Sequence, residues 1–167
     1  MELLNFNTSN IDYTALKQLV GQSVQVKEDI VEQDPFEHGI RKALNLGHTV
    51  GHAFESMALA EDRPVLHGYA VAWGIVCELY LSHLKVDFPK EKMRQTIQFI
   101  KDNYGVFTFD CKKYDQLYAF MTHDKKNTSG TINFTLLKDI GDICIHQTAD
   151  KDTIFEMLDF YRECMGI

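Results

Sequence analysis

Apolar side chains recur at helical spacing along most of this 167-residue chain, and this pattern restricts the folds open to it. One stretch departs from it. Residues Thr131–Leu137 are rich in β-forming side chains, and Gly141 separates them from Ile143–His146, which predicts one small hairpin. No series of strands alternates with helices, and the sequence has neither GxGxxG nor GxxxxGK[ST]. We therefore predict a mainly α, multi-helical domain with one small β-hairpin.

Capping and helix-breaking residues place the ends of the expected helices. Asp12 is a suitable N-cap for a first helix. The pair Asp34-Pro35 should end that helix, because the residue before a proline disfavours helical geometry. Pro89 favours the start of a later helix that runs to about residue 104. Further helices are expected at about 49–59, 68–84, 112–121 and 151–164.

The net charge, the apolar runs and the cysteine content argue against several classes of function. The net charge of -7 argues against nucleic acid as the main partner. No apolar run approaches the roughly 20 residues of a membrane-spanning helix, and residues 1–10 do not resemble a secretory signal. The four cysteines form no CxxC pair and suit reduced thiols. We expect a cytoplasmic protein that binds neither nucleic acid nor membranes.

Three of the seven histidines are spaced for a common site. His48 and His52 are four residues apart, so they share one face of a helix. His67 precedes the next expected helix, where a loop could return it to the same point. Neutral imidazole is a good ligand for zinc and related metals. The spacing indicates a metal site, although an HxxxH pair can also be satisfied by local hydrogen bonds.

These histidines lie within a longer set of sequence blocks. The first block is EHGIRKALNLGHTVGHAFE at 37–55, and Lys27, Val31 and Asp34 fit the same pattern upstream. Later blocks are LHG at 66–68, DKKN at 124–127 and FTLL at 134–137. Their order and spacing resemble the signature of 3-dehydroquinate synthases, from about residue 12 to the end of the chain.

The resemblance implies a lyase of the shikimate pathway, the route to chorismate and aromatic amino acids. Such enzymes convert 3-deoxy-D-arabino-heptulosonate 7-phosphate to 3-dehydroquinate and phosphate, using NAD and a divalent metal, zinc or cobalt. They combine an N-terminal NAD-binding domain with a helical C-terminal domain, and they form homodimers. Residues 1–167 would then be the single helical metal- and substrate-binding domain. The NAD-binding domain would be absent from this chain, and the chain alone would be inactive.

The resemblance also implies a role for each matched polar residue. His48 and His67 match the metal ligands, whereas His52 matches a histidine that contacts substrate and assists proton movement. Glu37 matches an acidic residue that organises the site, and it forms the catalytic group with His52 and Lys125. Four positions match residues that bind the phosphate, carboxylate or hydroxyl groups of the substrate: Lys27, Arg41, Asn45 and Lys125.

Two features depart from the family pattern. The third metal ligand, a glutamate in a glutamate-x-x-lysine stretch, has no convincing counterpart, because Glu2 lacks the following lysine. We expect that ligand upstream of Met1. The glutamate that usually follows Leu-His-Gly is replaced by Tyr69, whose hydroxyl could act as the outer partner of a metal ligand.

Other interpretations stay open. Lys27 and Lys125 would ordinarily be solvated surface charges, Arg41 could pair with Glu37 at helical spacing, and Asn45 could end a helix. Two other functions are also compatible with these residues. One is a related sugar-phosphate cyclase of the 2-deoxy-scyllo-inosose synthase type, and the other is a non-catalytic helical module that binds a partner.

Overall fold

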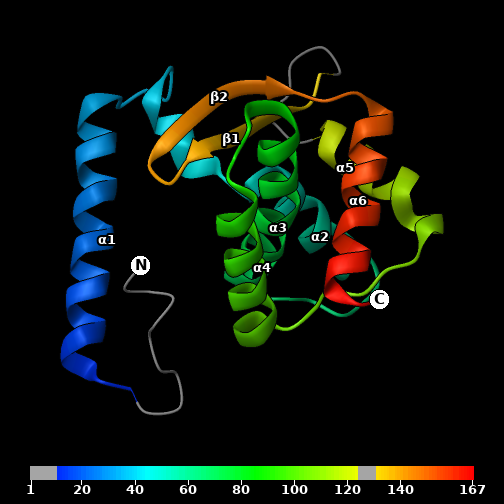
Figure 1. The fold of residues 1–167 in the computed structure, drawn as a ribbon, viewed down its shortest axis with the longest axis horizontal. Coiled ribbons are helices and arrows are strands. Elements are labelled where there is room, and N and C mark those ends of the chain that lie inside the picture. The colour runs from blue at the N-terminus through cyan, green and yellow to red at the C-terminus, as the bar shows by residue number, and fades with distance from the viewer. Residues whose placement is uncertain (1–10, 124–130) are drawn as a thin grey trace. The chain divides into compact units, whose positions relative to one another are not determined.

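The chain has the predicted mainly α architecture, and its computed structural model describes residues 11–123 and 131–167. Tertiary contacts divide the chain into two compact units, residues 1–44 and 45–167. The strands β1 (Asn133–Asp139) and β2 (Asp142–Thr148) form the only sheet within the described ranges (Figure 1). The predicted hairpin is therefore confirmed.

The first unit is dominated by α1 (Tyr13–Gln33) and followed by the short 3-10 helix η2 (Ile40–Asn45). As predicted, Asp12 caps α1: its Oδ1 accepts hydrogen bonds from the backbone N–H groups of Thr14 (2.8 Å) and Ala15 (3.2 Å). The helix ends before Asp34, also as predicted. None of the residues of α1 is buried. Capping and local hydrogen bonds, not core packing, therefore define this helix within its unit.

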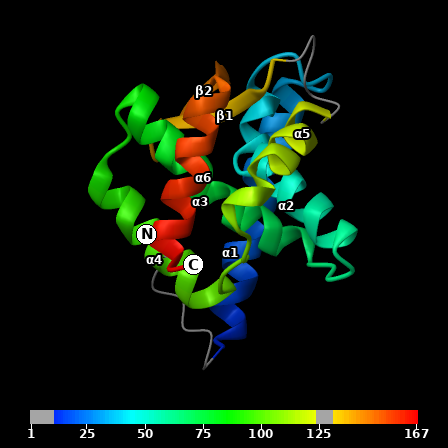
Figure 2. The ribbon, with the colours of Figure 1, turned by 90° about the vertical axis from the view of Figure 1, so that its right-hand side faces the viewer.

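The second unit is built around α3, which contacts α2, α4, α6 and β1 (Figure 2). The helix predicted at 112–121 is divided into a 3-10 turn and α5, and the other helices begin and end close to their predicted limits. No helix within the described ranges is long and apolar enough to cross a membrane. The elements are α2 (His48–Ala60), α3 (His67–Val86), α4 (Lys90–Tyr104), η3 (Cys111–Lys113), α5 (Tyr114–His123), β1 (Asn133–Asp139), β2 (Asp142–Thr148) and α6 (Lys151–Met165).

An aromatic cluster forms the centre of the core of this unit. The ring of Phe54 lies 5.1 Å from that of Phe107 and 5.2 Å from that of Tyr161, measured between centroids. The Tyr161 hydroxyl is fully buried, accepts from Phe107 N (3.0 Å) and donates to Phe107 O (3.2 Å). Burial raises the pKa of Tyr161, so the hydroxyl stays neutral. The core thus buries a polar group without leaving it unsatisfied.

The hairpin is antiparallel and lies across one end of the helices of the second unit (Figures 1 and 2). Gly141 occupies the left-handed region (φ 84°) in its turn, where a glycine is favoured. Two hydrogen bonds join β1 to the helices: Leu137 N donates to Ser82 Oγ of α3 (3.0 Å), and Thr49 Oγ1 of α2 donates to Asn133 O (2.9 Å). The hairpin therefore helps to fix the start of α2.

Candidate metal centre

The structure brings the three predicted histidines together at the starts of α2 and α3. His48 begins α2, His52 follows one turn later on the same face, and His67 begins α3. Their ring centroids are 5.5 Å apart for His48 and His52, 5.3 Å for His48 and His67, and 5.6 Å for His52 and His67. The three rings thus form a nearly equilateral cluster, and the return of His67 to the helical pair is confirmed.

Hydrogen bonds at Nδ1 determine the tautomers of two of these rings. His48 Nδ1 lies 3.1 Å from Leu46 O, and His67 Nδ1 lies 3.1 Å from Glu55 Oε2. A carbonyl and an ionised carboxylate only accept, so Nδ1 donates in both rings when they are neutral, and Nε2 carries the lone pair. Metal-binding histidines commonly hold their second N–H in this way. His48 and His67 are therefore in the tautomer that metal binding through Nε2 requires.

Glu55 takes the place that we expected for Tyr69. Glu55 lies seven residues after His48 on the same face of α2, and its side chain reaches His67. The Tyr69 ring instead lies edge-on to Trp73 and Tyr104, at centroid distances of 5.9 and 5.3 Å. The carboxylate beside His67 is thus supplied by α2.

The histidine cluster supplies only some of the protein ligands that a catalytic metal site needs. In residues 11–123 and 131–167, no group of three or more His, Cys, Asp or Glu side chains is arranged to hold a metal ion. His48 and His67 offer two imidazoles, whereas a catalytic zinc site usually has three protein ligands. The expected third ligand stays a prediction.

Glu78 is a further residue of this region, and sequence reasoning missed it. This α3 side chain is fully buried, and its carboxylate accepts hydrogen bonds from three backbone N–H groups around His48: Gly47 (2.6 Å), Thr49 (3.2 Å) and Val50 (3.4 Å). A glutamate within the apolar run IVCEL was the available signal, because carboxylates are almost never fully buried without partners.

In the first unit, Asp34 organises the loop that carries Glu37 and Arg41. Its carboxylate accepts from the backbone N–H groups of His38 (2.9 Å), Gly39 (2.7 Å) and Arg41 (3.1 Å). Glu37 has a positive φ of 59°, which is uncommon for a glutamate. Glu37 lies before η2, so Glu37 and Arg41 are not one turn apart on a single α-helix. The Arg41 guanidinium donates to Pro35 O (2.7 Å).

Replacing Asp34 with alanine should loosen this loop. Desolvation acts to raise the pKa of Asp34, but hydrogen bonds from Gly39, His38 and Arg41 outweigh it and lower the pKa below its ordinary value of 3.8. The carboxylate therefore stabilises the loop above pH 3.8, and this contribution is lost as the pH falls through the lowered folded pKa.

We expect the amides of His38, Gly39 and Arg41 to exchange several-fold faster in Asp34→Ala at neutral pH, as measured by NMR. The Thr14 and Ala15 amides, which are bonded to Asp12, are the internal control. Unchanged exchange in the loop would show that Asp34 does not order it.

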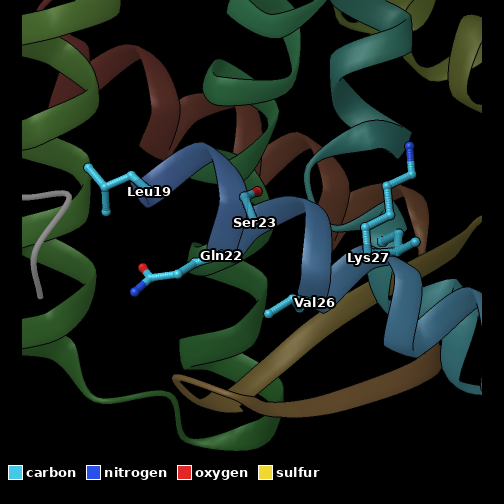
Figure 3. Close-up of a pocket in the computed structure, with 6 residues that line it drawn as sticks. Leu19, Gln22, Ser23, Val26 and Lys27 are labelled. Carbon is cyan, nitrogen blue, oxygen red and sulfur yellow. The ribbon is translucent and has the colours of Figure 1, made fainter. Parts of the chain in front are cut away.

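A pocket of the first unit contains one of the predicted substrate-binding residues. All of its lining side chains except that of Leu44 project from successive turns of α1 (Figure 3). The Lys27 side chain is exposed in this pocket, so its ammonium group is accessible to an anion. The pocket is lined by Leu19, Gln22, Ser23, Val26, Lys27 and Leu44.

Comparison with known proteins decides the family. The family model described as 3-dehydroquinate synthase C-terminal matches residues 1–127. The chain belongs to this family. The match includes all three histidines of the cluster and the loop of Asp34, and it confirms the resemblance found in the sequence blocks.

Individual 3-dehydroquinate synthases are similar over nearly the whole chain. The enzyme of Parabacteroides distasonis is 59% identical over 162 residues, covering 97% of this chain and 46% of the relative. That of Leptospira interrogans is 43% identical, covering 82% and 37%, and that of Oceanobacillus iheyensis is 36% identical, covering 99% and 45%. The chain thus spans less than half the length of these curated relatives.

A solved structure supports the fold. The chain resembles a 2-deoxy-scyllo-inosose synthase complexed with carbaglucose-6-phosphate, NAD+ and Co2+, with a TM-score of 0.73 over 95% of this chain and 44% of that one. At 20% sequence identity, the likeness shows the shared helical fold.

The remaining predicted residues of this 3-dehydroquinate synthase family member belong to other elements or lie outside the described ranges. Asn45 is the half-buried last residue of η2, and Arg41 belongs to the same short helix. Lys125 and Glu2 lie outside the described residues. Their predicted roles therefore enter the proposal below as expectations.

Proposed function

We propose that this chain is the metal- and substrate-binding part of a 3-dehydroquinate synthase. The observation that carries this proposal is the 59% identity to the Parabacteroides distasonis enzyme across almost the whole chain. The convergence of His48, His52 and His67 supports it independently. The reaction would convert 3-deoxy-D-arabino-heptulosonate 7-phosphate to 3-dehydroquinate and release phosphate.

His48 and His67 would hold the metal through Nε2, because Nδ1 of each donates to an oxygen atom. A bound zinc or cobalt ion would acidify the substrate hydroxyl that is oxidised and polarise the resulting ketone. His52 lies beside both rings, where it could accept or return a proton on the substrate. Glu55 would keep His67 in the required tautomer.

The cationic residues would bind the anionic groups of the substrate. Arg41 can hold a carboxylate or phosphate through two parallel hydrogen bonds, and its backbone N–H is held by Asp34. Lys27 and Lys125 would act as point charges, and the Asn45 amide can both donate to and accept from a hydroxyl. Glu37 would organise these groups.

NAD and the remaining catalytic parts would come from a portion that this chain does not span. The chain covers 46% of its Parabacteroides distasonis relative, and the solved cyclase that it resembles was crystallised with NAD+. We therefore expect residues 1–167 alone to show no turnover. The complete enzyme would bind its NAD mainly through the other domain and act as a homodimer.

Phosphate release provides the test. The chain is assayed alone and joined to the N-terminal part of the Parabacteroides distasonis synthase, with NAD, zinc and 3-deoxy-D-arabino-heptulosonate 7-phosphate. We expect turnover only from the joined protein. Turnover only with glucose 6-phosphate, of which carbaglucose-6-phosphate is an analogue, would favour a 2-deoxy-scyllo-inosose synthase. A folded joined protein without either activity would favour a non-catalytic module.

A further inference from the structure

The buried carboxylate of Glu78 has no role in the proposed chemistry, yet it lies next to the histidine cluster. Glu78 is 0% exposed, and a buried carboxylate is costly unless hydrogen bonds compensate it. Three backbone donors do so here: its Oε2 accepts from Gly47 N, and its Oε1 accepts from Thr49 N and Val50 N. All three donors belong to the first turn of α2 or its cap.

Glu78 thus supplies the N-terminal cap of α2 from another helix. The first N–H groups of a helix have no partner within it, and Gly47 at the N-cap has no side chain to serve them. By contrast, α1 and α6 are capped by their own Asp12 and Asp150. A carboxylate at this position forms charge-assisted hydrogen bonds and also interacts favourably with the helix dipole.

Close approach of α2 and α3 brings this carboxylate to the helix end. Gly74 lies one turn before Glu78 on α3, and a Cβ atom at Gly74 would lie 2.0 Å from Gly47 O. A Cβ atom at Gly47 would lie 2.5 Å from the side chain of Ile75. Glycine at both positions therefore lets Glu78 reach the backbone of Gly47 directly.

His48 stands between the two amides that Glu78 binds most closely, those of Gly47 and Thr49. Its own Nδ1 donates to Leu46 O just before this turn. We infer that Glu78 is a positioning residue for His48: by holding the backbone from Gly47 to Val50, it directs the His48 Nε2 lone pair into the three-histidine cluster. This inference rests on the proposed metal site for its functional meaning, but its geometry can be tested without a metal.

The first experiment reads the His48 tautomer by side-chain ¹⁵N NMR, at a pH well above the ordinary imidazole pKa of about 6.5. In the unmodified chain we expect one tautomer, protonated at Nδ1. Glu78→Leu should give a mixture, and Glu78→Gln, which keeps one acceptor oxygen, should give a smaller change. Val76→Ala is the matched control, because Val76 is also fully buried on α3 but its apolar side chain can accept no hydrogen bond from α2.

The second experiment titrates zinc into the joined protein and follows the His48 and His67 resonances, at temperatures where circular dichroism shows each variant folded. We expect zinc affinity to fall roughly ten- to hundredfold in Glu78→Leu, as for other outer partners of metal ligands, and to stay unchanged in Val76→Ala. Glu78→Leu could instead lower the unfolding temperature but retain the His48 tautomer and the zinc affinity. That result would overturn the inference, because Glu78 would then be a structural cap alone. If zinc shifts neither histidine even in the otherwise unmodified joined protein, the proposed metal site fails, and the tautomer result alone decides the role of Glu78.

Discussion

Alanine at His48 or His67 is expected to abolish high-affinity zinc binding by the joined protein. Each change removes one of the two imidazoles whose Nε2 lone pairs are set for a metal by Leu46 O and Glu55. Removing an outer partner of a metal ligand typically lowers metal affinity ten- to hundredfold. Removing the ligand itself should have a larger effect, so we expect zinc affinity to fall more than about a hundredfold. Calorimetry near neutral pH measures it.

His83→Ala is the matched control for these variants. His83 also belongs to α3, but its Nδ1 is paired with Phe88 O at the other end of the helix (2.8 Å). Its removal should leave zinc binding unchanged. Wild-type affinity in His48→Ala would place the metal elsewhere. Tight binding by the 167-residue chain alone would instead mean that it contains a third ligand, and Glu55 and His52 would be the first candidates.

Gly74→Ala is expected to be the most disruptive single-methyl change in the second unit. The added Cβ would lie 2.0 Å from Gly47 O and 2.7 Å from Gly51 N, and these backbone atoms cannot rotate away. Helix α2 would have to move off α3, so we expect a loss of about 1–3 kcal/mol or more in the free energy of unfolding. The same movement should withdraw the Glu78 cap and disturb the His48 tautomer.

Gly68→Ala separates this steric effect from helix propensity. Gly68 also lies in α3, but no described atom beyond its chain neighbours and its own helix backbone lies within 4 Å of the position that its Cβ would take. Alanine there should leave stability unchanged or raise it by up to about 1 kcal/mol. Denaturant unfolding of both variants makes the comparison. If Gly74→Ala and Gly68→Ala had the same free energy of unfolding, α2 and α3 would be able to move apart without a loss of stability.

Much of the fold was predictable because its signals are local. Asp12 and the Asp34-Pro35 pair marked both ends of α1 correctly, since capping and the proline restriction act within a few residues. The hairpin was predictable for the same reason, with Gly141 at its turn. Division of the helix at 112–121 was not foreseen, because a 3-10 turn and the first turn of an α-helix differ little in sequence pattern.

The candidate site also combines features that follow from the local sequence with features that depend on tertiary packing. The shared face of His48 and His52 follows from helix geometry alone. The position of His67 before the next expected helix indicated its return to this pair, and the ring distances agree. The sequence suggested the Tyr69 hydroxyl as the outer partner of a metal ligand, whereas in the structure the Glu55 carboxylate lies beside His67. Glu55 is twelve residues away in sequence and reaches His67 only through the packing of α2 on α3.

The sequence by itself determined the helical pattern, the hairpin and the spacing of the histidines, since these depend on neighbouring residues. Only the tertiary structure decided how the rings are oriented. Glu78 caps a helix that begins 30 residues earlier, and Gly47 and Gly74 matter because two helices meet there. Such contacts join residues far apart in the chain, so their energies depend on a packing arrangement that no local pattern encodes.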